Sequence, residues 1–311
     1  MEYTLSVLND SARISELIEL FRTGLGETTE EYWMWRLFTD NGQPDRPIAI
    51  VVEDEKGKMC GMSSILPVVY GRASSERKCV QFCDWVVHPS HRGKGIIKMI
   101  YEYAYCYYRD KGYDFIIEFP NDNSYPIFKK YGFHEEPHVD CWNSSKHLFR
   151  RKHQTSDVSV NGVDVCFTDS CPLTDEAFHR DDKIVRTSAF LRWKYDQNPE
   201  ANYKWVGFKQ NGSYIGYIAY VLTKGRFRTA VNIYDWEYPI SNNMAFKMAM
   251  QAISKQGNFL SVWGRYDRYG QELLKQCGLK SIACNTRLML KSISDKGWPE
   301  KLTLTRIDTD Y

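Results

Sequence analysis

The feature that most constrains this 311-residue chain is an internal repeat. Four landmarks of the first half recur in the same order in the second half. The matched pairs are Trp35-Arg36-Leu37 with Trp193-Lys194-Tyr195, Lys56-Gly57 with Asn211-Gly212, Asp84-Trp85 with Asp235-Trp236, and Tyr131-Gly132-Phe133 with Cys277-Gly278-Leu279. The separation of matched residues falls steadily from 158 to 146 residues, as a few short deletions in the second copy would produce. One structural unit is therefore predicted to be built twice.

Each copy is predicted to be a mixed α/β unit. In the first copy, β-branched and aromatic runs predict strands at 3–7, 78–87 and 115–119, and a hairpin over 47–66 that turns at 54–57. A helical period of apolar residues predicts a helix over 96–111, and a shorter helix is predicted over 124–130. Thr28-x-x-Glu31 has the form of a capping box at the start of another helix.

The boundary between the copies is predicted in the polar stretch 147–157. The two domains are then residues 1–150 and 156–311. Both lie within the usual size of a domain, about 100–200 residues.

Charge and cysteine usage exclude several classes of protein. Lys and Arg number 41 and Asp and Glu number 39, so the chain lacks the excess positive charge of a nucleic-acid-binding protein. Nine cysteines without a Cys-x-x-Cys pair argue against a disulfide framework and against a metal site. The segment 1–7 does not resemble a signal peptide, and no run approaches the roughly 18 apolar residues of a membrane helix. We expect a cytoplasmic protein with neither a membrane nor a nucleic-acid partner.

The motif with the clearest chemistry is His88-Pro89-Ser90-His91-Arg92-Gly93-Lys94-Gly95, between a predicted strand and the helix that follows. The first N–H groups of a helix have no partner within the helix, and the helix dipole favours an anion there. Glycines allow close approach, and Arg92 and Lys94 add positive charge. The motif predicts a pyrophosphate site. The matching part of the second copy, Pro239 to Met244, has no such loop.

The stretch from Asp84 to Phe133 resembles the GCN5-related N-acetyltransferase (GNAT) superfamily. Arg92 and Gly95 match its Arg/Gln-x-x-Gly-x-Gly/Ala pattern, with Ile97 in place of the second small residue, and Asn121 and Tyr131-Gly132-Phe133 match its later landmarks. The resemblance implies two tandem domains, each a twisted, mostly antiparallel sheet flanked by helices. It also implies an acyltransferase that transfers acyl groups other than amino-acyl groups (EC 2.3.1).

The resemblance further implies a binding site for acetyl-CoA or a short (hydroxy)acyl-CoA in the first domain. The loop amides would hold the pyrophosphate, and the strand end would pair with the pantetheine arm. The residues implied are Val86, Val87, Arg92, Gly93, Lys94, Gly95, Ile96, Asn121 and Phe128.

The catalytic acid and base are harder to predict. Phe128 stands where many members of the family carry the tyrosine that protonates the thiolate, and Gln81 aligns with a common glutamate base. Asp84 as base and Tyr131 as acid are the remaining candidates, although Asp84 recurs as Asp235 in the copy without a loop, which favours a structural role. Tyr125 is an alternative acid. His88, His91 or water could instead take the proton of the amine.

The second domain is predicted either to support the first or to bind the acceptor. Trp33, Arg265 and Arg268 are candidate acceptor contacts, whereas Trp35 repeats as Trp193 and is therefore expected in the core. Tandem copies with one cofactor site resemble N-acyltransferases of surface-polysaccharide (O-antigen) biosynthesis. That resemblance implies a nucleotide-linked, dTDP-type amino-deoxysugar as substrate. The alternatives are another small amine or peptide as acceptor, or an inactive coenzyme-A-binding module. We expect a monomer or homodimer.

Overall fold

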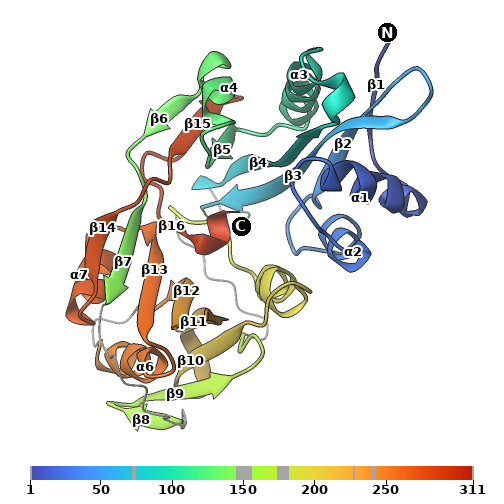
Figure 1. Ribbon diagram of the computed structural model, residues 1–311. Coiled ribbons are helices and arrows are strands. Elements are labelled where there is room, and N and C mark those ends of the chain that lie inside the picture. The colour runs from blue at the N-terminus through green and yellow to red at the C-terminus, as the bar shows by residue number, and fades with distance from the viewer. Residues whose placement is uncertain are drawn as a thin grey trace.

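The structure is a computed structural model that describes residues 2–71, 75–144, 156–173, 182–226, 228–239 and 243–309. Two twisted sheets lie side by side, each with helices packed against it (Figure 1). The predicted α/β fold with two tandem, mostly antiparallel units is confirmed. Most of the predicted boundary stretch, 147–157, lies outside the described residues.

The first sheet has the strand order β1-β2-β3-β4-β5-β15-β6, in which only β4 and β5 are parallel neighbours. Its strands are β1 (Thr4–Val7), β2 (Ile48–Glu53), β3 (Met59–Tyr70), β4 (Arg77–Val87), β5 (Phe115–Glu118), β6 (His134–Glu136) and β15 (Leu288–Ser292). Its helices are α1 (Ile14–Arg22), α2 (Glu30–Phe38), α3 (Ile96–Asp110) and α4 (Tyr125–Lys130), with 3-10 turns at Ser11–Arg13 and Pro89–His91.

The second sheet has the order β14-β7-β13-β12-β11-β10-β9-β8, with β16 paired to β13. Its strands are β7 (Asp140–Ser144), β8 (Val158–Val160), β9 (Val163–Thr168), β10 (Lys204–Gln210), β11 (Ser213–Lys224), β12 (Thr229–Glu237), β13 (Phe259–Arg265), β14 (Lys280–Ala283) and β16 (Leu304–Thr305). Its helices are α5 (Ser188–Leu191), a π-helical turn (Arg192–Asp196), α6 (Met244–Ser254), α7 (Arg268–Gln276) and a 3-10 turn (Arg306–Asp308).

The two sheets exchange one strand each. β15, from the second half of the chain, lies between β5 and β6, where Leu290 pairs with both Ile117 and His134 (Figure 1). β7, from the first half, lies between β13 and β14, where Trp142 pairs with Val262. The predicted domains 1–150 and 156–311 therefore do not coincide with the two sheets, because each sheet takes an inner strand from the other half.

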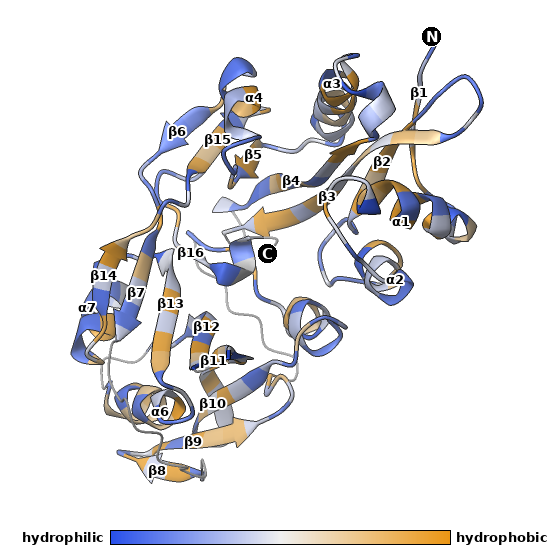
Figure 2. Cartoon of the chain, in the orientation of Figure 1, coloured by the Kyte–Doolittle hydropathy of each residue, from blue (hydrophilic) through white to orange (hydrophobic). Residues whose placement is uncertain are grey.

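The composition of β15 explains why it fits inside a sheet. A strand with neighbours on both edges and helices or a second sheet over its faces must be apolar on both faces. Leu288, Met289 and Leu290 are all fully buried, and β15 is among the hydrophobic strands in Figure 2. Leu288 and Leu290 pack between the two sheets, whereas Met289 packs beneath α3.

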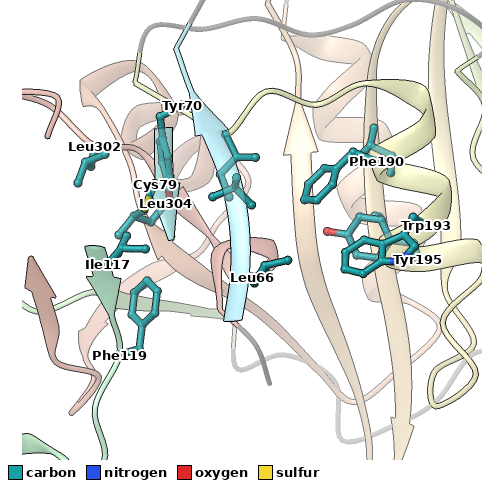
Figure 3. Close-up of a cluster of buried hydrophobic side chains, with 14 of the residues drawn as sticks. Leu66, Tyr70, Cys79, Ile117, Phe119, Phe190, Trp193, Tyr195, Leu302 and Leu304 are labelled. Atoms are coloured by element: carbon teal, nitrogen blue, oxygen red, sulfur yellow. The ribbon is translucent and has the colours of Figure 1, made fainter. Parts of the chain in front are cut away.

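The repeated tryptophans meet at the centre of the molecule, as predicted for the core. The rings of Trp35 and Trp193 stack with centroids 4.8 Å apart, and each indole N–H donates to the other tryptophan's carbonyl oxygen. Figure 3 shows Trp193 in the apolar cluster that both sheets share, together with Phe190 and Leu66. Such a stacked pair adds about 0.5–1.5 kcal/mol to the free energy of unfolding beyond area burial. The two repeated tryptophans thus form a pseudo-symmetric contact between the copies.

One local prediction was wrong by a residue. The cap of α2 is Thr29, whose hydroxyl oxygen accepts the N–H of Tyr32, and Thr28 is buried instead of forming a capping box with Glu31. In the part of the chain that the structure describes, no helix has the length and apolar character needed to cross a bilayer.

Candidate active site

The predicted anion site is a turn that leads directly into α3. Gly95 is the N-cap of α3 with φ of +81°, Gly93 has φ of +74°, and no side chain caps the helix. A Cβ atom on either glycine would meet nothing within 4 Å, so protein packing does not demand glycine there. The left-handed backbone demands it, and the open space lets a ligand reach the first amides of α3. The exposed side chains of Arg92 and Lys94 flank this turn.

The position of the turn is fixed by contacts beneath it. Ile96 is buried against Gly61 of β3, where any added Cβ would collide with the Ile96 Cγ2 atom. Arg92 Nε donates to the Val87 carbonyl oxygen over 3.3 Å. The amides of α3 are therefore held next to the end of β4, as a pyrophosphate site requires.

The two histidines of the motif already have local partners. His88 Nδ1 lies 2.7 Å from Ser90 Oγ, and His91 Nδ1 lies 3.1 Å from the Tyr3 hydroxyl. His91 Nε2 is also 3.9 Å from Asp54 Oδ2. These contacts favour a role in shaping the turn over a role as base.

Beyond the turn, β4 has an open edge on the side of β5. The two strands pair only at Cys79 with Phe115 and at Val80 with Ile116. Val86 and Val87 pair with β3 on their other side. Among the described residues, no strand pairs with the β5 side of β4 after Val80. A free edge of this kind binds an extended chain with amide groups, which is the chemistry of pantetheine.

In the second copy, the chain itself enters the equivalent gap between β12 and β13. β12 and β13 stop pairing after Ile233 and Val262, and β16 then pairs with β13, with Thr305 opposite Gly264. A Cβ on Gly264 would collide with the Leu304 carbonyl oxygen. The fold therefore accommodates a strand-like segment at this position, and the second copy has no room for a ligand there.

Asp84 lies at a β-bulge opposite β3. Its φ is +54°, a left-handed conformation that costs about 1–2 kcal/mol for a residue other than glycine. Its carboxylate accepts a hydrogen bond from the Ser64 hydroxyl and lies 3.6 Å from Arg36 Nε, in a guanidinium that is only 1% exposed. Both partners belong to α2 and β3, so the carboxylate ties these elements to the bulge.

Asp84→Asn is expected to affect stability more than catalysis. Asparagine tolerates the left-handed backbone but leaves the buried Arg36 without its counter-charge. We expect the free energy of unfolding to fall by about 1–3 kcal/mol, measured by urea denaturation, with turnover nearly unchanged below the unfolding transition. A loss of turnover in a variant of native stability would identify Asp84 as the base after all.

The aromatic residues of α4 lie in a packed cluster. Phe128 is buried, with its ring 5.2 Å from Trp85 and 4.9 Å from Phe133. Tyr131 stacks on Tyr101 with centroids 4.2 Å apart, and burial raises the pKa of Tyr131, which therefore stays protonated at neutral pH. Phe128 is thus a core residue, whereas Tyr131 keeps a proton that it could donate.

Tyr101 of α3 was not predicted as a site residue, but the surroundings of its hydroxyl group are unusual. Its hydroxyl is buried and has no hydrogen-bond partner among the described residues. Burial raises the pKa of this phenol well above its usual range. The nearby Trp85 indole N–H is also buried without a described partner. Two unsatisfied donors beside one strand leave polar groups available for a ligand.

Asn121 organises the loop between β5 and α4. Its Oδ1 accepts the N–H groups of Asn123 and Ser124, both over 3.0 Å. Arg287, immediately before β15, holds the same loop: its Nη1 lies 2.8 Å from Asp122 Oδ1, and its guanidinium lies over the Tyr125 ring at 4.5 Å. The second half of the chain thus contributes contacts to the loop between β5 and α4.

The predicted acceptor residues do not gather at one place. Trp33 is fully buried, with its ring 5.3 Å from those of Phe21 and Tyr32, which favours a packing role. Arg265 Nη1 pairs with Glu136 Oε2 of the first sheet over 3.1 Å. Arg268 begins α7 and is exposed. Of the three, Arg268 has the most accessible charge.

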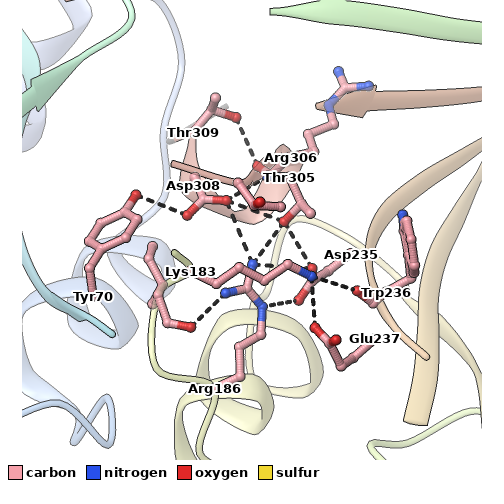
Figure 4. Close-up of polar contacts among 12 residues, drawn as sticks. Tyr70, Lys183, Arg186, Asp235, Trp236, Glu237, Thr305, Arg306, Asp308 and Thr309 are labelled. Carbon is pink, nitrogen blue, oxygen red and sulfur yellow. Dashed lines mark hydrogen bonds and ion pairs between the residues drawn. The ribbon is translucent and has the colours of Figure 1, made fainter. Parts of the chain in front are cut away.

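The counterpart of Asp84 in the second copy is part of a buried ionic cluster (Figure 4). Asp235 is fully buried and accepts from both Nε and Nη2 of Arg186, at 2.7 and 3.2 Å, and from the Tyr217 hydroxyl at 2.6 Å. Lys183 Nζ pairs with Glu237 Oε2 over 2.7 Å. The aspartate at this position therefore makes structural contacts in both copies.

Asp308 is a third carboxylate in this cluster. Burial alone would raise the pKa of Asp235, but the Arg186 guanidinium outweighs burial and lowers it. For Asp308, burial raises the pKa, and Arg186 at 3.6 Å only partly opposes the change. The cluster thus holds two cations, Arg186 and Lys183, among the carboxylates of Asp235, Glu237 and Asp308. Each buried charge lies near an opposite charge, because an unpaired one costs several kcal/mol.

Within the described ranges, no group of three or more histidine, cysteine, aspartate or glutamate side chains is arranged to hold a metal ion.

Comparison with known proteins agrees with this geometry. Residues 9–135 match the family model described as an acetyltransferase (GNAT) domain. No curated protein gave a match to the chain. The match includes the glycine turn, the open edge of β4 and α4. Residues 9–135 therefore resemble a GNAT acetyltransferase domain, and the chain is an acyltransferase.

Several solved structures share the two-domain fold. A protein from Enterococcus faecalis V583, described as a probable N-acyltransferase, is 13% identical, with a TM-score of 0.68 over 94% of this chain and 73% of its own. A GCN5-related N-acetyltransferase from Anabaena variabilis is 12% identical, with a TM-score of 0.67 over the same shares. A tandem GNAT protein from the clavulanic acid biosynthesis pathway is 11% identical, with a TM-score of 0.53 over 94% of this chain and 99% of its own. These likenesses concern the fold.

Proposed function

We propose that this chain transfers an acyl group from acetyl-CoA or a short hydroxyacyl-CoA to an amine at a site in its first domain. The observation that carries the proposal is the glycine turn before α3 beside the open edge of β4. The turn offers amides and positive charge to a pyrophosphate, and the strand offers its edge to the pantetheine arm. The second copy has neither feature: residues 239–244 contain no glycine, and β16 lies in the gap between β12 and β13.

The proposed reaction is direct attack. The amine nitrogen bonds to the thioester carbonyl carbon, the carbon–sulfur bond breaks, the amine loses a proton and the thiolate gains one. The protein contributes orientation and polar groups rather than a covalent intermediate. Tyr131 and Tyr101 are the proposed sources of the thiolate proton, because burial keeps their phenols protonated. Tyr101 packs against Phe82 of β4, and Tyr131 stacks on Tyr101.

For the acceptor, we propose the amino group of a nucleotide-linked amino-deoxysugar, of the dTDP type, in polysaccharide biosynthesis. Sequence resemblance motivates this choice, and the exposed Arg268 is the side chain proposed to meet the diphosphate. The alternatives are another small amine or peptide, or a coenzyme-A-binding module without catalysis. Nine free cysteines, five of them not fully buried, fit a reducing compartment, and we propose a cytoplasmic location.

The test is an assay of thiol release with acetyl-CoA and 3-hydroxybutyryl-CoA. The acceptors are dTDP-linked 3-amino and 4-amino dideoxyhexoses, with glucosamine and spermidine as non-nucleotide amines. We expect turnover that depends on the dTDP-sugar. Turnover with a non-nucleotide amine alone would favour the first alternative. Coenzyme A binding by calorimetry without turnover on any amine would favour the second.

A further inference from the structure

Glu118 is a buried carboxylate at the inner end of the open edge. It is the last residue of β5, only 3% exposed, after the apolar run Phe115-Ile116-Ile117. Its Oε1 accepts the N–H of Phe82 over 2.7 Å, two residues beyond the last pairing of β4 with β5. The carboxylate thus spans the point where the two strands separate.

The path of the cofactor along β4 leads to this carboxylate. The glycine turn before α3 follows Val87, and the open edge of β4 runs back from Val87 to Phe82. At about 3.3 Å per residue this edge is about 17 Å long, which is comparable with an extended pantetheine arm. An arm bound along this edge would bring its thioester end to Phe82, against which Glu118 lies.

The second copy offers an internal comparison. The last parallel pair is Val80 with Ile116 in the first sheet and Ile233 with Val262 in the second, so Glu118 corresponds to Gly264. At Gly264 the Leu304 carbonyl oxygen leaves no room for a side chain. A carboxylate occupies this position only in the copy that keeps the cofactor turn.

We propose that Glu118 is the catalytic base: it accepts the proton that the acceptor amine loses as its nitrogen bonds to the thioester carbon. The carbon–sulfur bond breaks in the same reaction, and the thiolate takes a proton from a phenol or from solvent. This inference rests on the proposed acyltransferase function. Glu118 thus takes the role of base that was predicted from the sequence for Asp84, whose carboxylate is held by Arg36 and Ser64.

The groups around Glu118 suit a proton acceptor. Cys79 of β4 and Tyr101 of α3 are within its electrostatic reach, and burial keeps both protonated by raising their pKa values. Lys291 of β15 lies beyond Tyr101, with Nζ 5.3 Å from that ring, and burial lowers the pKa of Lys291. Proton transfer to a positioned carboxylate contributes about 10²–10⁴-fold to a rate.

The test compares Glu118→Gln with the wild type, using acetyl-CoA and the best amine found above. The pH is varied from about 5.5 to about 9, a range on both sides of neutrality. Glutamine keeps an oxygen that can accept the Phe82 N–H, so the strand contact is retained. We expect kcat/KM at neutral pH to fall by about 100-fold or more with KM for acetyl-CoA unchanged. Without a base the reaction needs an amine that is already neutral. The deficit should therefore shrink as pH rises toward the pKa of the amine.

Two further variants control this experiment. Glu118→Asp keeps a carboxylate and should retain the wild-type pH profile at a reduced rate. Glu53→Gln removes the carboxylate that ends β2 and pairs with Arg13, on a strand that β3 separates from β4, and should keep full activity. A Glu118→Gln variant with wild-type kcat/KM, or with the same deficit at every pH, would overturn the role of Glu118 and leave the proposed function standing. A wild type that binds coenzyme A but acylates no amine would overturn the proposed function and this inference with it.

Discussion

Gly95→Val is expected to weaken coenzyme A binding by about 100-fold or more. The valine side chain would enter the open space beside the turn, and the β-branched residue would resist the left-handed φ of +81°. Losing two charge-assisted hydrogen bonds from loop amides to the pyrophosphate, at about 1.5–3 kcal/mol each, corresponds to a loss of that size. Isothermal titration calorimetry with coenzyme A measures it.

Gly112→Val is the matched control for this variant. Gly112 follows the other end of α3, has φ of +73°, and has no atom within 4 Å of an added Cβ. Backbone strain should therefore lower the free energy of unfolding by about 1–2 kcal/mol in both variants. Only Gly95→Val should lose the cofactor. Equal affinity in the two variants would remove the turn from the binding site.

Arg186→Met is expected to lower the free energy of unfolding by about 3–5 kcal/mol. Arg186 is fully buried and is the direct partner of Asp235, and its Nη2 also donates to Thr305 over 3.0 Å. Removing the guanidinium leaves buried carboxylates without compensation. Urea denaturation followed by circular dichroism measures the loss.

The pH dependence of that loss identifies its cause. In the wild type the pKa of Asp235 is lowered, so its contribution is present above the unfolded value of about 4 and is lost as pH falls through the folded value. The raised pKa of Asp308 acts in the opposite direction and partly offsets this. Without Arg186, acid should stabilise the variant relative to the wild type. Adding Asp235→Asn to Arg186→Met should recover part of the loss, and a strictly additive double variant would contradict the ionic explanation.

Sequence periodicity predicted the local elements of the first copy well. The helix that begins at Ile96 and the hairpin that turns near Gly57 lie where polar and apolar alternation indicated. The repeat was also informative beyond secondary structure, because Trp35 and Trp193 contact each other across the two sheets. The helix and hairpin patterns involve residues close together in the sequence, and the repeat is found by comparing the chain with itself. A single sequence is therefore enough to detect them.

Long-range pairing and the conformation of single residues could not be read in the same way. Nothing in Leu288-Met289-Leu290 indicates that it pairs with β5 and β6 rather than with strands of its own half. The left-handed Asp84 could not be predicted, because a bulge depends on the register with β3. Glu118 was missed although a carboxylate at the end of an apolar run is a usable signal, since a buried carboxylate needs a reason to be there.

The strand exchange also bears on how the chain folds as it is synthesised. A strand placed between β5 and β6 is available only after residues 288–292 have left the ribosome, long after both of its neighbours. Until then the edges of β5 and β6 that pair with β15 are exposed in the nascent first half. Its strand β7 likewise has no partner until β13 has been synthesised. The first half therefore cannot complete its sheet before the second half has been synthesised. A truncated product of translation would leave no independently working acyltransferase.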